Sequence, residues 1–152
     1  MTDWIETYKG VISASEYDPK SHMNTHAYVS RFDQATWFLM AHVGLTPRSV
    51  ADKGNRIAVL RQNFQMVNEL QGWELISIRS GFIAVGNKHM RFQHRMFDTE
   101  TDQMMATSDC TAVVASLETG RSTSLEQAVA EAAKRLLVTD NDADRLDLDA
   151  QV

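Results

Sequence analysis

Between residues 24 and 44, apolar side chains recur at three- and four-residue steps, which is the spacing of one helix face. Asn24 or Thr25 can cap the start of this helix, and Gly44 supplies its C-terminal stop. Other bulky groups, including Trp37 and Phe38, lie outside that stripe. A helix that is apolar on more than one face is usually enclosed, so the pattern predicts a long, largely buried helix. The stripe consists of Tyr28, Phe32, Ala35, Leu39 and Val43.

The rest of the chain shows mainly the shorter repeat of β-strands, mixing β-branched, aromatic and polar residues. Connections between the last four of these segments are too short for crossover helices, which predicts antiparallel hairpins. Ser124 and Gln127 have the spacing of a capping box, which predicts a final helix from there to about Val138. A sheet wrapped around one central helix satisfies this order, so the predicted fold class is α+β. The predicted strands are 5–15, 57–67, 73–85, 88–98 and 103–117.

Length and composition are those of one ordinary globular domain: the chain has 152 residues, of which 43% are hydrophobic and 23% charged. No apolar run approaches the roughly 20 residues that cross a bilayer. The first residues lack the basic and apolar regions of a signal peptide. The single cysteine, Cys110, cannot form an internal disulfide and is expected to be a small buried hydrophobe. We therefore expect a cytoplasmic protein without a membrane partner.

Charge is unevenly distributed along the chain. Residues 139–152 hold five aspartates and one arginine, so they carry −4 of the net charge of −5. The remaining body, at about −1, lacks the clustered basic surface that nucleic-acid binding requires. The acidic segment also lacks apolar content and is expected to be disordered. We therefore predict a folded domain over residues 1–138, an acidic tail over 139–152, and no nucleic-acid partner.

The densest polar stretch, Asp18 to Tyr28, lies where the first strand ends and the buried helix begins. A helix N-terminus offers unpaired backbone N–H groups and partial positive charge, which suit a developing oxyanion. A carboxylate beside such a site can attack an ester carbonyl or activate water. Thioesters suit this arrangement, because their carbonyl is electrophilic without help from a metal.

The same stretch resembles the signature of the 4-hydroxybenzoyl-CoA thioesterase family of hotdog-fold proteins. The matching residues are Asp18, Ser21-His22-Met23-Asn24, Tyr28 and Phe32, and the resemblance covers roughly residues 5–120. The family usually has Gly where this chain has Ser21. This departure leaves a second function open, a non-catalytic acyl-CoA-binding hotdog protein. A dehydratase, the other main hotdog chemistry, is disfavoured because its catalytic histidine deeper in the helix region is not found here.

The resemblance implies a catalytic role for four residues. Asp18 occupies the position of the catalytic carboxylate, acting as nucleophile or general base. Thr25 occupies the helix-start position whose backbone N–H polarises the thioester carbonyl. His22 and Asn24 would hold the loop or contact the thioester, although a structural hydrogen bond is the plainer interpretation of His22.

The resemblance also implies where substrate binds. Tyr28 would lie beside the acyl pocket, and the stretch around Lys88, His89 and Met90 would lie near the pantetheine and phosphates of CoA. Glu69 is a candidate second carboxylate near the pocket, although a solvated loop charge is the simpler interpretation. CoA is part of the substrate, so no separate cofactor is expected. No metal is expected either, because the histidines lack a supporting carboxylate or cysteine pattern.

Assembly and acyl group follow from the same resemblance. Hotdog enzymes are at least dimers with pockets between protomers, so a homodimer or homotetramer is expected.

The similarity is strongest to thioesterases of carnitine breakdown, which hydrolyse betainyl-CoA. A quaternary ammonium acyl group would need an aromatic cage, although the same side chains would serve a plain or aryl acyl chain. The candidates for this cage are Tyr28, Trp37, Phe38 and Trp73.

Removing residues 139–152 is predicted to leave the melting temperature and the activity nearly unchanged, because this segment has no apolar periodicity with which to pack. Thermal unfolding of the full and truncated chains measures the effect. A drop of many degrees would show that Leu146 and Leu148 pack onto the body or a partner subunit.

Overall fold

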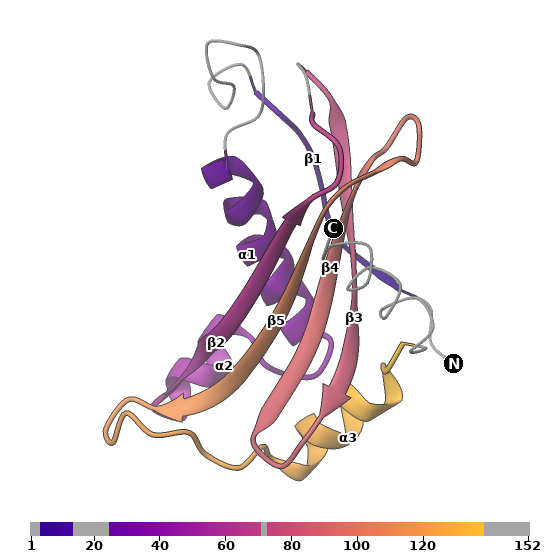
Figure 1. The fold of residues 1–152 in the computed structure, drawn as a ribbon. Helices are drawn as coiled ribbons and strands as arrows, with labels where there is room; N and C mark the ends of the chain where they lie inside the picture. The colour runs from indigo at the N-terminus through magenta and orange to yellow at the C-terminus, as the bar shows by residue number, and fades with distance from the viewer. Residues whose placement is uncertain (1–3, 14–24, 71–72, 139–152) are drawn as a thin grey trace.

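The computed structural model describes residues 4–13, 25–70 and 73–138, which form one curved antiparallel sheet with three helices (Figure 1). The sheet has five strands in the order β1-β3-β4-β5-β2. No described helix has the length and hydropathy needed to span a membrane. The strands are β1 (Ile5–Val11), β2 (Asn55–Met66), β3 (Leu75–Val85), β4 (His89–Asp98) and β5 (Met104–Ser116). The helices are α1 (Thr25–Ala41), α2 (Pro47–Asp52) and α3 (Gln127–Arg135).

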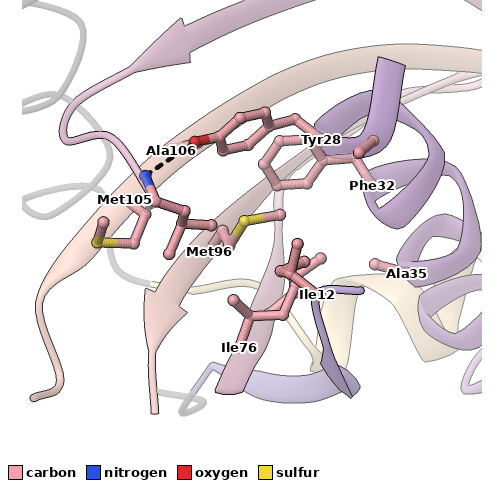
Figure 2. Packing of buried hydrophobic residues seen from close by; sticks show 11 residues of the cluster. Ile12, Tyr28, Phe32, Ala35, Ile76, Met96, Met105 and Ala106 are labelled. Carbon is pink, nitrogen blue, oxygen red and sulfur yellow. Dashed lines mark hydrogen bonds between the residues drawn. The ribbon is translucent and has the colours of Figure 1, made fainter. Parts of the chain in front are cut away.

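Helix α1 lies against the inner face of the sheet and supplies one side of the hydrophobic core (Figures 1 and 2). Its buried residues Tyr28, Phe32, Ala35 and Leu39 belong to the apolar stripe that the sequence predicts. Gly44 adopts φ 90°, a conformation that glycine reaches at little cost, and ends the helical segment as predicted. The central helix and the sheet around it are therefore confirmed.

The prediction that α1 is enclosed on more than one face is wrong. Trp37 and Phe38 are 37% and 59% exposed, so only one face of the helix is buried by this chain. Their apolar surface lies on the side of α1 that the sheet does not cover. Trp37 and Phe38 therefore lie at the surface, whereas Met40, which is also outside the predicted stripe, is fully buried.

The predicted strands agree with the observed ones to within about two residues, except at the first. β1 ends at Val11, and the predicted continuation to residue 15 runs partly into residues outside the described part of the chain. Residues 139–152, the predicted tail, also lie outside it. Short connections join β3 to β4 and β4 to β5 as antiparallel neighbours, as the hairpin spacing predicts. The hairpin predicted between β2 and β3 is wrong, because β2 pairs with β5 at one edge of the sheet while β3 lies between β1 and β4.

Two local features differ from the sequence-based prediction. Helix α2 was not anticipated, because six residues are too few for a hydrophobic period. Its signal is a capping box of Thr46 and Ser49 with Pro47 at the first helical position. The capping box predicted at Ser124 is wrong, since α3 begins at Gln127 and its N-cap, Glu126, makes no side-chain capping bond.

A buried polar network crosses the core between the sheet and α1. His94 on β4 is fully buried. Its Nδ1 lies 2.5 Å from the Ser80 hydroxyl on β3, and its Nε2 lies 2.8 Å from the Thr36 hydroxyl on α1. The Ser80 hydroxyl is 2.7 Å from that of Thr7 on β1. One imidazole therefore joins three strands and the helix, with Phe32 stacked on its face.

This network is satisfied only by a neutral imidazole in which one ring nitrogen donates and the other accepts. The Thr36 hydroxyl can donate to the carbonyl of Phe32, 3.1 Å away, and so leave its oxygen to accept from His94. Burial lowers the pKa of His94 to about 3, because the cation would lose its hydration in the core. The network therefore stabilises the fold while His94 stays neutral.

Acid is predicted to destabilise the fold through His94. Between pH 6.5 and about 3 the unfolded chain binds a proton at this residue and the folded chain does not, so the free energy of unfolding falls as pH falls. The loss attributable to His94 is about 2 kcal/mol at pH 5 relative to neutral pH. Urea unfolding at several pH values, compared with His94→Gln, measures it.

The variant should show a smaller decrease in stability between pH 7.5 and 5 than the wild type. Where the variant fails to fold, an NMR titration of the wild-type imidazole replaces it. A His94 ring that titrates near pH 6.5 in the folded chain would contradict the prediction.

Candidate active site

The N-terminus of α1 begins with exposed residues and is anchored to the rest of the fold. Thr25 is the first residue of the helix, and both Thr25 and His26 are exposed. The exposure of His26 agrees with the sequence-based expectation. The first backbone N–H groups of a helix have no partner within the helix and carry partial positive charge. This end of α1 can therefore polarise a carbonyl oxygen or stabilise an oxyanion that approaches it.

Tyr28 fixes the position of this helix end. Its side chain is buried, and its hydroxyl oxygen accepts a hydrogen bond of 3.3 Å from the backbone N–H of Leu70 (Figure 2). Its ring meets Phe64 of β2 edge to face, with centroids 5.7 Å apart. Tyr28 thus joins the first turn of α1 to the segment after β2. The resemblance predicts Tyr28 beside the acyl pocket, but its side chain packs into the hydrophobic core of this chain.

Three of the four predicted catalytic residues, Asp18, His22 and Asn24, lie outside the described part of the chain. Only Thr25 has a described position, at the helix start where the oxyanion role was predicted. Glu69 is exposed immediately before Leu70, whose backbone N–H binds Tyr28. Glu69 therefore lies near the N-terminal end of α1, where a second carboxylate was predicted.

The residues predicted to contact CoA lie at the other end of the sheet. Lys88 and His89 are exposed at the turn between β3 and β4, in the opposite direction from the α1 N-terminus (Figure 1). The 11 residues of β3 span roughly 35 Å at the usual strand rise. Within one chain, these side chains and Thr25 do not form one compact site.

The prediction that Met90 contacts the substrate directly is wrong within one chain. Its side chain is fully buried in the core cluster that contains Leu39, Met40 and Phe92. An apolar side chain facing the sheet interior has no surface to offer a CoA phosphate or pantetheine. Alternation along β4 explains the error, because Met90 faces inward while the neighbouring His89 is exposed.

A cavity of about 340 Å³ lies between α1 and β2. A second hollow of about 350 Å³ lies along the exposed side of α1. Asp33 and Trp37, one helical turn apart, line both. The remaining residues that line the first cavity are Thr36, Ile57 and Val59.

Sequence analysis missed Asp33, because a single carboxylate on a helix has the pattern of an ordinary solvated charge.

The aromatic residues predicted to form a cage do not come together within one chain. Trp37 lines the cavity, Tyr28 is in the core, and Trp73 is an exposed residue with φ 34° before β3.

Other reactive groups in the described residues have structural roles. Cys110 is buried, as predicted, and burial raises the pKa of its thiol to about 11, which keeps it protonated. Within residues 4–13, 25–70 and 73–138, no group of three His, Cys, Asp or Glu side chains is arranged to hold a metal ion.

The fold and sequence match known proteins over most of the chain. Residues 12–133 match the family model of the thioesterase-like superfamily. A betainyl-CoA thioesterase of Pseudomonas aeruginosa is 24% identical over 145 residues, covering 91% of each chain.

Solved structures share the fold at low sequence identity. A hypothetical protein of Staphylococcus aureus, solved in complex with CoA, superposes with a TM-score of 0.82 at 11% identity, covering 91% of this chain and 89% of that one. A DHNA-CoA thioesterase of the same species superposes with a TM-score of 0.78 at 12% identity, covering 98% and 96%.

The family model spans β2 to β5, α1, α2 and most of α3, so it covers most of the fold, apart from β1, and not an isolated motif. A five-stranded antiparallel sheet around a central helix is the hotdog architecture. The chain therefore belongs to the thioesterase-like superfamily, as a thioester hydrolase with the hotdog fold.

Proposed function

We propose that this protein hydrolyses an acyl-CoA, with betainyl-CoA as its substrate and Asp18 as its catalytic carboxylate. The exposed, anchored N-terminus of α1 is the observation that carries the proposal, because a helix N-terminus carries partial positive charge and this one directly follows in sequence the segment that contains Asp18. The named relative that acts on betainyl-CoA and the neighbour solved with CoA support the choice of substrate. Within the superfamily, we propose that the chain belongs to the 4-hydroxybenzoyl-CoA thioesterase family.

In the proposed reaction, the thioester carbonyl oxygen accepts a hydrogen bond from the backbone N–H at Thr25. Asp18 either removes a proton from the water that attacks the carbonyl carbon, or attacks that carbon itself and forms an acyl anhydride that water then hydrolyses. The C–S bond breaks, and CoA leaves as a thiolate that takes up a proton. The net reaction consumes one water and gives the free acid and CoA thiol. His22 and Asn24 would position the loop that carries Asp18.

We further propose that the working unit is a homodimer, the smallest form of the predicted homodimer or homotetramer. β2 is an edge strand of 12 residues, and in the described chain it pairs only with β5. Val59 and Leu60 on β2 are exposed, and Val59 lines the same cavity as Trp37 of α1. Long apolar edges are normally paired or covered, which favours β2 as the interface.

A two-fold axis at β2 would also explain the separation of the predicted substrate residues. Antiparallel pairing of two β2 strands brings opposite ends of the two sheets together. The turn with Lys88 and His89 in one protomer would then approach the α1 N-terminus of the other. CoA would be held across protomers, and Glu69 would lie beside the acyl end.

Asp18→Asn is predicted to lower kcat for acyl-CoA hydrolysis at least a hundredfold, because the amide cannot act as a base or as an anionic nucleophile. Release of free CoA thiol, followed with a thiol-reactive dye on an acyl-CoA panel, measures it. Asp52→Asn on α2 is the matched control and should keep wild-type turnover. Near wild-type hydrolysis by folded Asp18→Asn would show that Asp18 only stabilises a turn.

Leu60→Glu is predicted to shift the protein from dimer to a 17.1 kDa monomer, because it places a charge on the apolar edge of β2. Leu117→Glu is the matched control: Leu117 is 61% exposed, close to the 59% of Leu60, but lies in the turn after β5. Sedimentation at micromolar concentration measures both. A wild-type monomer that still hydrolyses acyl-CoA would contradict the shared-site arrangement.

A further inference from the structure

A further cavity, of about 110 Å³, lies between α2, α3 and the start of β2. Figure 1 shows both helices at the same end of the sheet. Gly44, just beyond the C-terminal end of α1, lines this cavity, whereas Thr25 begins that helix. The 17 residues of α1 span roughly 25 Å at the usual helix rise. Within one chain, the cavity is therefore separate from the proposed reaction centre.

The inner wall of the cavity is aliphatic. Val50 of α2, Val114 of β5 and Val129 of α3 are buried and line it, together with the half-buried Leu45 and Leu125. An apolar cavity of about 150 Å³ holds a benzene ring, so a cavity of about 110 Å³ suits an alkyl group of about four carbon atoms. The wall thus defines the size and the apolar part of a ligand.

An ion pair between the two helices supplies the charged part of the cavity lining. Lys53 of α2 donates a hydrogen bond of 2.5 Å to Glu126, the N-cap residue of α3. Their side chains are 56% and 57% exposed, so this pair lies at the solvent side of the cavity. An ammonium has three N–H donors, and Glu126 is the one partner of Lys53 among the described residues. Two donors therefore remain for a ligand.

Charge at this position favours an anion over a cation. The N-terminal end of a helix carries partial positive charge, so the start of α3 adds to the charge of Lys53. The Ser124 hydroxyl and the Asn55 amide also line the cavity and can donate hydrogen bonds. A carboxylate accepts from all these groups, whereas an ammonium would pair with Glu126 and be repelled by Lys53.

We propose that this cavity binds a short-chain aliphatic carboxylate, with its alkyl chain against Val50, Val114 and Val129 and its carboxylate on Lys53. The site goes beyond the proposed thioester hydrolysis and does not depend on it. Binding involves no covalent step, because the ligand is held by apolar contact and a charge-assisted hydrogen bond.

Butyrate, its neutral analogue butyramide and the cation butylammonium test the charge preference. Each is titrated into the full wild-type chain, and the methyl resonances of Val114 and Val129 are followed by NMR. Butyrate should shift both with a Kd of about 1 mM, which six heavy atoms can supply. Butyramide should bind about tenfold or more weakly, because it lacks the charge, and butylammonium should leave both resonances in place.

The aliphatic wall is tested in the wild-type chain by the length of the ligand. Acetate lacks two of the methylene groups that the valines would bury, so it should bind about tenfold more weakly than butyrate. Equal affinities of acetate and butyrate would show that only the surface charge of Lys53 attracts the anion, and would overturn the proposal.

Lys53 and Glu126 are tested by substitutions with opposite expected effects. Lys53→Met keeps most of the aliphatic stem and removes the ammonium, so butyrate affinity should fall about tenfold, whereas Lys53→Arg should retain most of it. Glu126→Gln removes a competing negative charge and should raise butyrate affinity about twofold or more. Lys134→Met is the matched control, since Lys134 is exposed in the last turn of α3 and does not line the cavity. It should change the affinity less than twofold.

A purely structural role of the ion pair would make Lys53→Met and Glu126→Gln lower the affinity together, and that result would overturn the proposal. Unshifted Val114 and Val129 methyl resonances at butyrate concentrations well above the expected Kd would also overturn it. So would equal affinities for butyrate and butyramide.

Discussion

Burial of one face of α1 against the curved sheet is the interaction on which the rest of the structure depends. Tyr28, Phe32 and Leu39 fill the space between helix and strands, and α1, with 17 residues, is the longest helix in the described part of the chain. Because Tyr28 also binds the backbone after β2, packing fixes where the helix begins. The core thereby places a polar, open helix end at the proposed reaction centre.

A second constraint is polar and lies inside that apolar contact. His94 joins hydroxyl groups of Ser80 and Thr36, so the helix and the strands have one favourable alignment. Burying an imidazole costs free energy unless both ring nitrogens form hydrogen bonds. A shift of α1 along the sheet, or of β4 along β3, would break these bonds and destabilise the fold. The same helix turn carries Thr36 toward His94 and Trp37 toward the cavity between α1 and β2, so the helix wall of that cavity depends on this alignment.

Much of the fold was predictable because long elements carry a clear period. The α1 stripe and the hairpin strands were found from spacing, whereas α2 was too short and the start of α3 lacked its expected cap. Burial was less predictable, since Trp37 and Phe38 show that an apolar residue need not face the core. In the candidate site, only the helix-start position of Thr25 followed from sequence and is described. Asp33 has no sequence motif, because only the fold places it at the cavity between α1 and β2.

Thioester hydrolysis by the wild-type chain is the most direct test of the whole account. Free thiol release is measured across a panel of acyl-CoAs that includes betainyl-CoA, with thermal unfolding in the presence of CoA measured in parallel. The account predicts rapid thiol release, with betainyl-CoA hydrolysed at the highest kcat/KM. A rise in melting temperature with CoA but no thiol release from any substrate would contradict it and identify an acyl-CoA-binding protein instead.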